Sequence, residues 1–123
     1  MLTKIIGYES KGFNKSYSNE EWLVALKNSA PENTREAVNI IECHHETDEI
    51  FILLDGKATV VEAVVENSEV KSITEIPMEK GKLHVIPKNV WHTTWMQPHS
   101  KLAIIERADT SYDNSDFIDI DSL

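Results

Sequence analysis

Hydrophobic residues in this chain occur in short runs separated by turn-forming residues, a pattern typical of β-structure. Strands are predicted at residues 38–45, 50–54, 58–65, 70–76, 83–86, 91–96 and 102–107. The run at 22–27 follows a capping-box pattern at 18–21, but its alternation and shortness favour a strand over a helix. Residues 1–17 fit an extended lead-in or a strand, and 117–120 could add an edge strand or dock on a neighbour. Short strands with frequent turns predict an all-β sandwich or barrel.

The most informative stretch runs from Glu42 to Gly56, where potential metal ligands precede a predicted hairpin turn. Asp55-Gly56 separates two β-rich runs, and this dipeptide indicates a hairpin because both of its positions tolerate φ > 0. Glu49 begins the first run, whose two faces are both apolar beyond it, so this strand is predicted to be covered on both sides. A buried carboxylate needs a partner, and His44 and His45 are the nearest candidates.

A second stretch, at residues 81–92, contains a short strand, a Pro/Asn turn and a histidine that enters the next strand. Together the two stretches resemble the paired motifs of the cupin superfamily. The residues that match these motifs are Glu49, Gly56, Gly81, Pro87 and His92. Two positions depart from the second motif: Asn89 stands in place of a glycine, and Met96 stands in place of an asparagine.

The resemblance spans residues 38–107 and implies an all-β fold, the double-stranded β-helix or RmlC-like jelly-roll barrel. It implies a single cupin domain over residues 1–123, with the barrel at about 20–107 and an acidic C-terminal tail at 108–123. Two hairpins would then face one cavity. Cupins host many chemistries, so the resemblance alone does not name a reaction.

The first motif is irregular because it lacks the His-x-His pair that the resemblance leads us to expect. If four residues separate the second histidine of the motif from Glu49, His44 takes the place of that histidine and Glu42 takes the place of the first. If three residues separate them, His45 takes the place of the second histidine and Cys43 takes the place of the first. We favour the first register, in which Glu42 and His44 share a strand face with apolar residues before them. The predicted metal ligands are His44, Glu49, His92 and Glu42.

This ligand set would suit a divalent Fe, Mn, Ni, Co or Zn ion, since imidazole and carboxylate donors are acceptable to all of them. Glu42 is the weakest member, because it could instead accept a hydrogen bond from a ligating histidine. Cys43 is most simply a small buried residue.

Composition narrows the classes of function. The formal net charge of −9 argues against binding to nucleic acid or to anionic membranes, which both demand basic patches. A single cysteine excludes an internal disulfide, and with no signal-peptide pattern at the N-terminus it fits a cytoplasmic protein. Apolar Leu2, Ile5 and Ile6 have no obvious place in an eight-stranded core, and small cupins commonly pair, so a homodimer is expected.

Two functions from different classes follow. One is a metal-dependent enzyme whose pocket takes a small oxygen-rich molecule, with the reaction undefined. The other is a non-catalytic small-molecule binding or sensor module with the same pocket. A metal-free, sugar isomerase- or epimerase-like cupin is weakened by the lack of a recognisable phosphate-binding motif. No nucleophile elbow and no Cys-x-x-Cys is present either.

Overall fold

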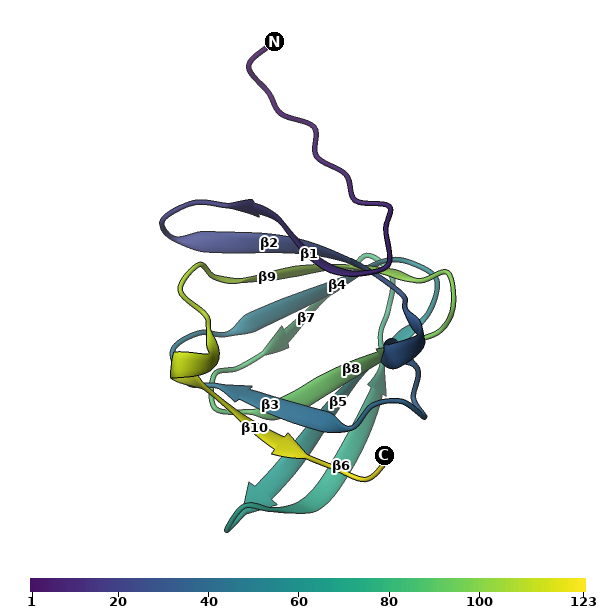
Figure 1. Cartoon of the computed structure of the whole chain (residues 1–123), viewed down its shortest axis with the longest axis vertical. Helices are drawn as coiled ribbons and strands as arrows, with labels where there is room; N and C mark the ends of the chain where they lie inside the picture. The colour runs from purple at the N-terminus through teal and green to yellow at the C-terminus, as the bar shows by residue number, and fades with distance from the viewer.

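The computed structural model describes residues 1–123 as two antiparallel five-stranded sheets that face each other (Figure 1). Sheet A has the strand order β1-β2-β9-β4-β7, and sheet B has the order β10-β3-β8-β5-β6. The strands are β1 (Gly12–Ser18), β2 (Trp22–Asn28), β3 (Ile40–His44), β4 (Glu49–Asp55), β5 (Ala58–Glu66), β6 (Glu69–Pro77), β7 (Leu83–Ile86), β8 (Trp91–Met96), β9 (Lys101–Arg107) and β10 (Ser115–Asp119). Two 3-10 turns, η1 (Pro31–Asn33) and η2 (Tyr112–Asn114), are the only helical segments. The predicted all-β jelly-roll class is confirmed.

The strand predicted at 22–27 is confirmed as β2, and no helix follows residues 18–21. The side chain of Asn19 instead accepts hydrogen bonds from the backbone N–H groups of Glu21 and Trp22, which closes a turn between β1 and β2. Leu23 and Ala25 on alternate positions of β2 are fully buried. The alternation of residues with a period of two therefore predicted this strand correctly, whereas the capping-box pattern wrongly indicated a helix.

The two hairpins predicted within the motifs do not form, because the two strands of each predicted hairpin do not pair with each other. β4 pairs with β9 and β7, whereas β5 pairs with β8 and β6, so Asp55-Gly56 carries the chain from sheet A to sheet B. Of the two turn residues only Gly56 has a positive φ, at 75°. The turn is held by Ser100, whose hydroxyl accepts a hydrogen bond from the N–H of Lys57 at 2.8 Å and packs against Gly56. Likewise, β7 lies in sheet A and β8 in sheet B.

A tight hairpin with two residues of positive φ joins β5 and β6 instead. Asn67 and Ser68 have φ values of 53° and 63°, and the strands on either side are paired from Glu66 to Thr59 with one register shift between Val64 and Val65. Asn tolerates this left-handed conformation better than most residues, which suits this two-residue turn.

The core lies between the sheets, and the barrel is longer than the predicted range of 20–107. Phe51, Val60, Met96 and Leu102 from both sheets are buried in one apolar cluster. β1 lies before residue 20, and β10 pairs with β3 after residue 107, which confirms the edge strand predicted near 117–120. The expected acidic tail is therefore partly a strand of sheet B. The structure contains no helix with the length and apolarity needed to cross a bilayer.

Candidate metal centre

The predicted ligands converge from both sheets in the barrel interior. Glu42 and His44 are two residues apart on β3, so both side chains point to the same face of sheet B. The register places Glu42 directly opposite His92 on β8. Glu49, the first residue of β4, comes from the facing sheet A. One donor atom from each of these four side chains lies within 4.8 Å of the others.

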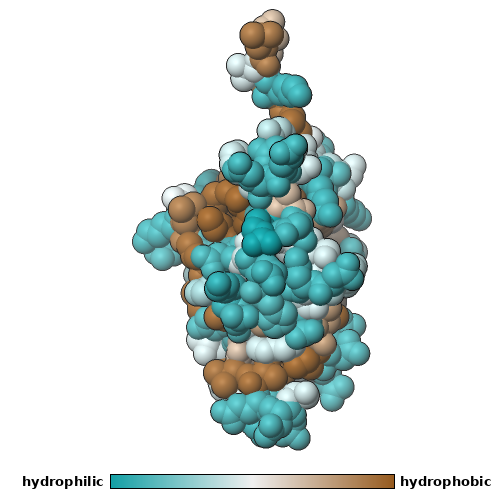
Figure 2. All heavy atoms as spheres, turned by 90° about the vertical axis from the view of Figure 1, so that its left-hand side faces the viewer, coloured by the Kyte–Doolittle hydropathy of each residue, from teal (hydrophilic) through white to brown (hydrophobic).

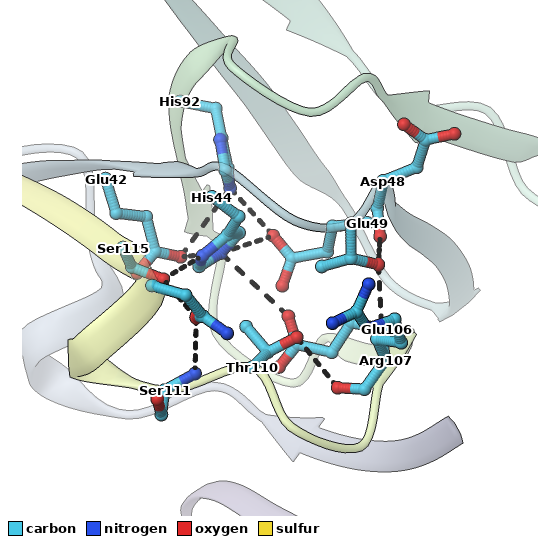
Figure 3. A network of polar contacts seen from close by, with 12 residues as sticks. Glu42, His44, Asp48, Glu49, His92, Glu106, Arg107, Thr110, Ser111 and Ser115 are labelled. Atoms are coloured by element: carbon cyan, nitrogen blue, oxygen red, sulfur yellow. Dashed lines mark hydrogen bonds and ion pairs between the residues drawn. The ribbon is translucent and has the colours of Figure 1, made fainter. Parts of the chain in front are cut away.

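The distances within this group are short. The imidazole Nε2 of His92 lies 2.7 Å from Oε1 of Glu49 and 3.6 Å from Oε1 of Glu42. The Nε2 of His44 lies 3.5 Å from the same oxygen of each carboxylate. His92 and Glu49 are only 1% and 5% exposed, so contacts with protein groups replace almost all of the contacts that these side chains would otherwise make with water. Figure 3 shows the carboxylates directed toward the ring of His44.

The other ring nitrogen of each histidine is held by a group outside the cluster. Nδ1 of His92 donates to the carbonyl of Val90 at 2.9 Å, and Nδ1 of His44 lies 2.7 Å from the hydroxyl of Ser115. Such contacts fix the orientation of a ligating imidazole and direct its Nε2 toward the ion. Ser115 lies on β10, in the segment that the sequence analysis predicted as an acidic C-terminal tail.

The structure places His44, and not His45, in the cluster. The ring of His45 points away from it and bonds to the side chains of Asn89 at 2.9 Å and Asp116 at 2.8 Å. Cys43 is buried, and burial raises the pKa of its thiol. The favoured register is therefore the one that brings Glu42 and His44 to the same site.

Glu106 on β9 is a further member that the sequence reasoning missed. Its Oε2 lies 3.9 Å from Nε2 of His44, and both atoms are buried without a hydrogen-bond partner. The signal was present, because Leu102, Ile104 and Glu106 alternate on one face and the first two are buried. The cluster thus contains three carboxyl groups and two imidazoles.

Mutual interactions strongly shift the pKa values of the cluster. Burial acts to lower the pKa of each histidine, but the carboxylates of Glu42 and Glu49 outweigh it and raise the pKa of His92 to about 9 and of His44 to about 10. Burial acts to raise the pKa of both carboxylates, yet hydrogen bonds from the histidines lower that of Glu42 to about 2, and lower that of Glu49 as well. Burial, with the negative charge of Glu49 beside it, raises the pKa of Glu106 to about 8. Without an ion, protons on the imidazoles balance the carboxylates.

These residues fit a divalent ion. Two imidazole nitrogens and two or three carboxylate oxygens form a donor set that first-row divalent metals accept. Ligand distances of roughly 2.0–2.2 Å place donors on opposite sides of an ion about 4.2 Å apart, close to the spread of the present atoms. The buried, unpaired Nε2 of His44 and Oε2 of Glu106 are atoms that an ion would satisfy.

The cluster opens into a pocket of about 340 Å³ between the sheets. Glu42, Glu49 and His92 line it, together with Lys27 of β2 and Asn33 of η1. This volume lies at the lower end of the range for small-molecule sites.

Solved structures share this architecture. A cupin-2 domain protein from Shewanella frigidimarina superposes with a TM-score of 0.53 at 20% identity, over 81% of this chain and 84% of that one. The chain has the cupin fold. Streptomyces Pac13 with uridine matches with a TM-score of 0.64 at 11% identity, over 99% and 95% of the two chains. The Fe(II) form of HppE matches with a TM-score of 0.52 at 15% identity, over 70% of this chain and 42% of that one. No protein-family model and no curated protein matches the sequence.

Proposed function

We propose that this cupin-fold protein binds a divalent transition-metal ion through His44, Glu49, His92 and Glu42, and that its pocket takes a small oxygen-rich molecule. The observation that carries the proposal is the convergence of two imidazole Nε2 atoms and two carboxylates from opposite sheets. Both imidazoles are held at Nδ1, as ligating histidines usually are. The known Fe(II) form of one cupin-fold neighbour and the uridine bound to another are consistent with an ion and a small ligand in such a barrel.

A bound ion would supply Lewis acidity, or oxygen activation, to a substrate with oxygen donors. The chain's own residues would do the rest. His44, His92 and Glu49 hold the centre between the sheets, and the buried side chains of Val38, Phe51 and Ile104 form the apolar part of the pocket wall. Glu106 is placed beside the centre with one free carboxyl oxygen, so it is the group we assign to accept or hold a proton during turnover.

One observation favours a second candidate, a metal-free enzyme that moves protons. His92 and Glu49 form a buried pair at 2.7 Å, and a histidine held by a carboxylate is a common acid–base unit. The two candidates differ in what the protein contains after purification, since only the first requires a stoichiometric ion.

The test is metal binding by purified protein. Apo protein is titrated with Mn(II), Ni(II) and Zn(II), and bound metal is measured by elemental analysis and calorimetry. We expect one ion per chain, which is lost in His44→Ala and His92→Ala and retained in His45→Ala, because His45 faces away from the cluster. If no ion binds to the wild-type protein, the metal proposal fails and the acid–base pair becomes the better explanation. We also expect the protein in a reducing compartment such as the cytoplasm, given its one buried thiol.

A further inference from the structure

A half-buried lysine, Lys27, lines the pocket from the wall formed by β2. Lys27 lies two positions after Ala25 on β2, on the face where Leu23 and Ala25 are fully buried. Its neighbours across the strands are Phe13 and Leu102, so its stem crosses apolar surroundings and its ammonium group lines the pocket. An inward lysine is unusual because burying an unpaired charge is costly.

The ammonium group of Lys27 has no direct partner in the protein. It forms none of the ion pairs or side-chain hydrogen bonds of the structure, and its electrostatic neighbours Glu42, Glu49 and Glu32 act only at longer range. A second polar atom of the same pocket is also unpaired, because Oδ1 of Asn33 is buried without a hydrogen bond. The ammonium group of Lys27 could take a hydrogen-bond acceptor from outside the chain, whereas Oδ1 of Asn33 could take only a donor.

A metal ion would change the charge balance at Lys27. Without the ion, Glu42 and Glu49 help to retain the proton of Lys27, while burial acts first to lower the pKa of this amine. A divalent ion would take up the charge of both carboxylates. The positive charge of Lys27 would then be left without compensation in a partly dry pocket, which favours an anion there.

We propose that the pocket recognises a small hydroxy- or oxo-acid, with oxygen donors directed to the metal centre and a further carboxylate received by the ammonium group of Lys27. This inference rests on the proposed metal centre. The simpler reading, that Lys27 only balances the charges of Glu42 and Glu49, is an outcome of the test.

The test uses the metal-loaded protein and two probes, malate and lactate. Both have a 2-hydroxy acid head, and malate adds a second carboxylate. A charge-assisted hydrogen bond predicts that malate binds at least about tenfold more tightly than lactate. Lys27→Met should remove this preference without weakening metal binding, because Lys27 is not a ligand and its positive charge opposes that of the ion. Lys57→Met, which removes one exposed positive charge, should retain it.

The outcomes separate the two proposals. If metal binds but malate shows no preference over lactate, or if Lys27→Met keeps the preference, the anion site is wrong and Lys27 is a charge-balancing residue. If no metal binds, the proposed centre fails and this inference falls with it. Calorimetry measures both affinities on the same samples.

A different observation supports an interface between two copies of this chain. The outer face of sheet A carries two neighbouring rows of apolar side chains with no charged residue among them. One row crosses four strands in register and consists of Val24, Ile105, Ile50 and Val85. The next row ends in Leu83, and both Leu83 and Val85 are exposed. The prediction that β4 is covered on both faces holds fully only for its inner face, because Ile50 and Ile52 on the outer face are half-buried within one chain.

The N-terminal arm, residues 1–7, leaves the barrel from the same side. Figure 1 shows it extending away from sheet A, and Figure 2 shows hydrophobic spheres at its free end and on the flank of the barrel at the height of this sheet. Leu2 is fully exposed, and Ile5 is 84% exposed. Residues 8–10 are fixed, because the carbonyls of Tyr8 and Ser10 accept hydrogen bonds from Asn28. The arm therefore projects from a defined point.

We infer that two copies pair through the outer faces of sheet A and that each arm lies on the partner. Two molecules of net charge −9 repel, so they associate best through a face whose central rows are uncharged. Each copy offers both an uncovered apolar face and an apolar segment, and a two-fold pair would bury both at once. A stable interface needs about 800 Å² per partner, which a five-stranded face with an added arm can provide.

A matched pair of substitutions tests this interface. Val85 on sheet A and Val64 on sheet B are 51% and 52% exposed. Val85→Glu should weaken dimerisation at least about tenfold, while Val64→Glu should leave it unchanged. Replacing Leu2, Ile5 and Ile6 by Gln should also weaken it. A wild-type monomer at micromolar concentration by sedimentation, or equal behaviour of the two valine variants, would overturn the interface, and an unaffected arm variant would remove the arm from it.

Discussion

Raising the pH should destabilise the metal-free protein through His92. The carboxylates of Glu42 and Glu49 raise the pKa of this histidine from 6.5 to about 9. The folded protein therefore binds the proton more tightly than the unfolded chain does. The resulting stabilisation is fully present below pH 6.5 and is lost as the pH rises through about 9.

The size of the effect follows from the pKa difference. At 1.36 kcal/mol for each pKa unit, the shift corresponds to about 3 kcal/mol. Little solvent screening is expected because His92 is almost completely buried. For a domain of this size that loss lowers Tm by roughly 10 °C. The raised pKa values of His44 and Glu106 act in the same direction above pH 6.5, so the fall for the whole site should be no smaller.

The assay is thermal unfolding of metal-free protein between pH 6 and pH 9.5, followed by circular dichroism. His92→Gln removes the titrating group and should make the fall in Tm smaller by roughly 10 °C. His99→Asn is the control, since His99 is exposed in a turn with φ of 64°, a conformation that Asn tolerates. Saturating metal should reverse the slope, because only neutral imidazoles bind a metal ion.

A Tm that stays constant or rises between pH 6 and 9.5 in the metal-free protein would refute the reasoning. So would a His92→Gln variant with the same pH profile as the wild type. Either result would mean that the carboxylates do not hold a proton on His92 and that the cluster is organised by something other than charge.

Three further outcomes are expected from the same site and its frame. Glu49→Gln should lose metal in a calorimetric titration, whereas Glu106→Gln should keep it within a few-fold, since only the first carboxylate contacts both histidines. Ser115→Ala removes the partner of His44 Nδ1 and should weaken metal binding roughly 10-fold or more, with a stability loss of about 1 kcal/mol in denaturant melts. Gly56→Ala should lower stability by more than about 1 kcal/mol, because a side chain at φ of 75° would collide with Ser100; an unchanged urea midpoint would contradict this.

The sequence by itself determined the local elements and most of the site. Alternation of apolar and polar residues predicted the strands, because successive side chains of a strand point to opposite faces. The spacing of Glu49 and His92 within two motifs identified the fold, and the shared face of Glu42 and His44 favoured the register that the structure contains. These features depend on neighbours in the chain, which is why the sequence alone could predict them.

Only the tertiary structure decided which strands pair and which distant groups complete the site. Asp55-Gly56 resembles a hairpin turn, yet the edges of β4 are taken by β9 and β7, and the turn is clamped by Ser100 from a later segment. Glu106 and Ser115 follow His44 by 62 and 71 residues in the sequence and lie on other strands. No spacing within a single motif could therefore have predicted their contacts with His44. The environment of Lys27 is set in the same way, because its place in the pocket wall and its missing partner appear only when both sheets close around the pocket.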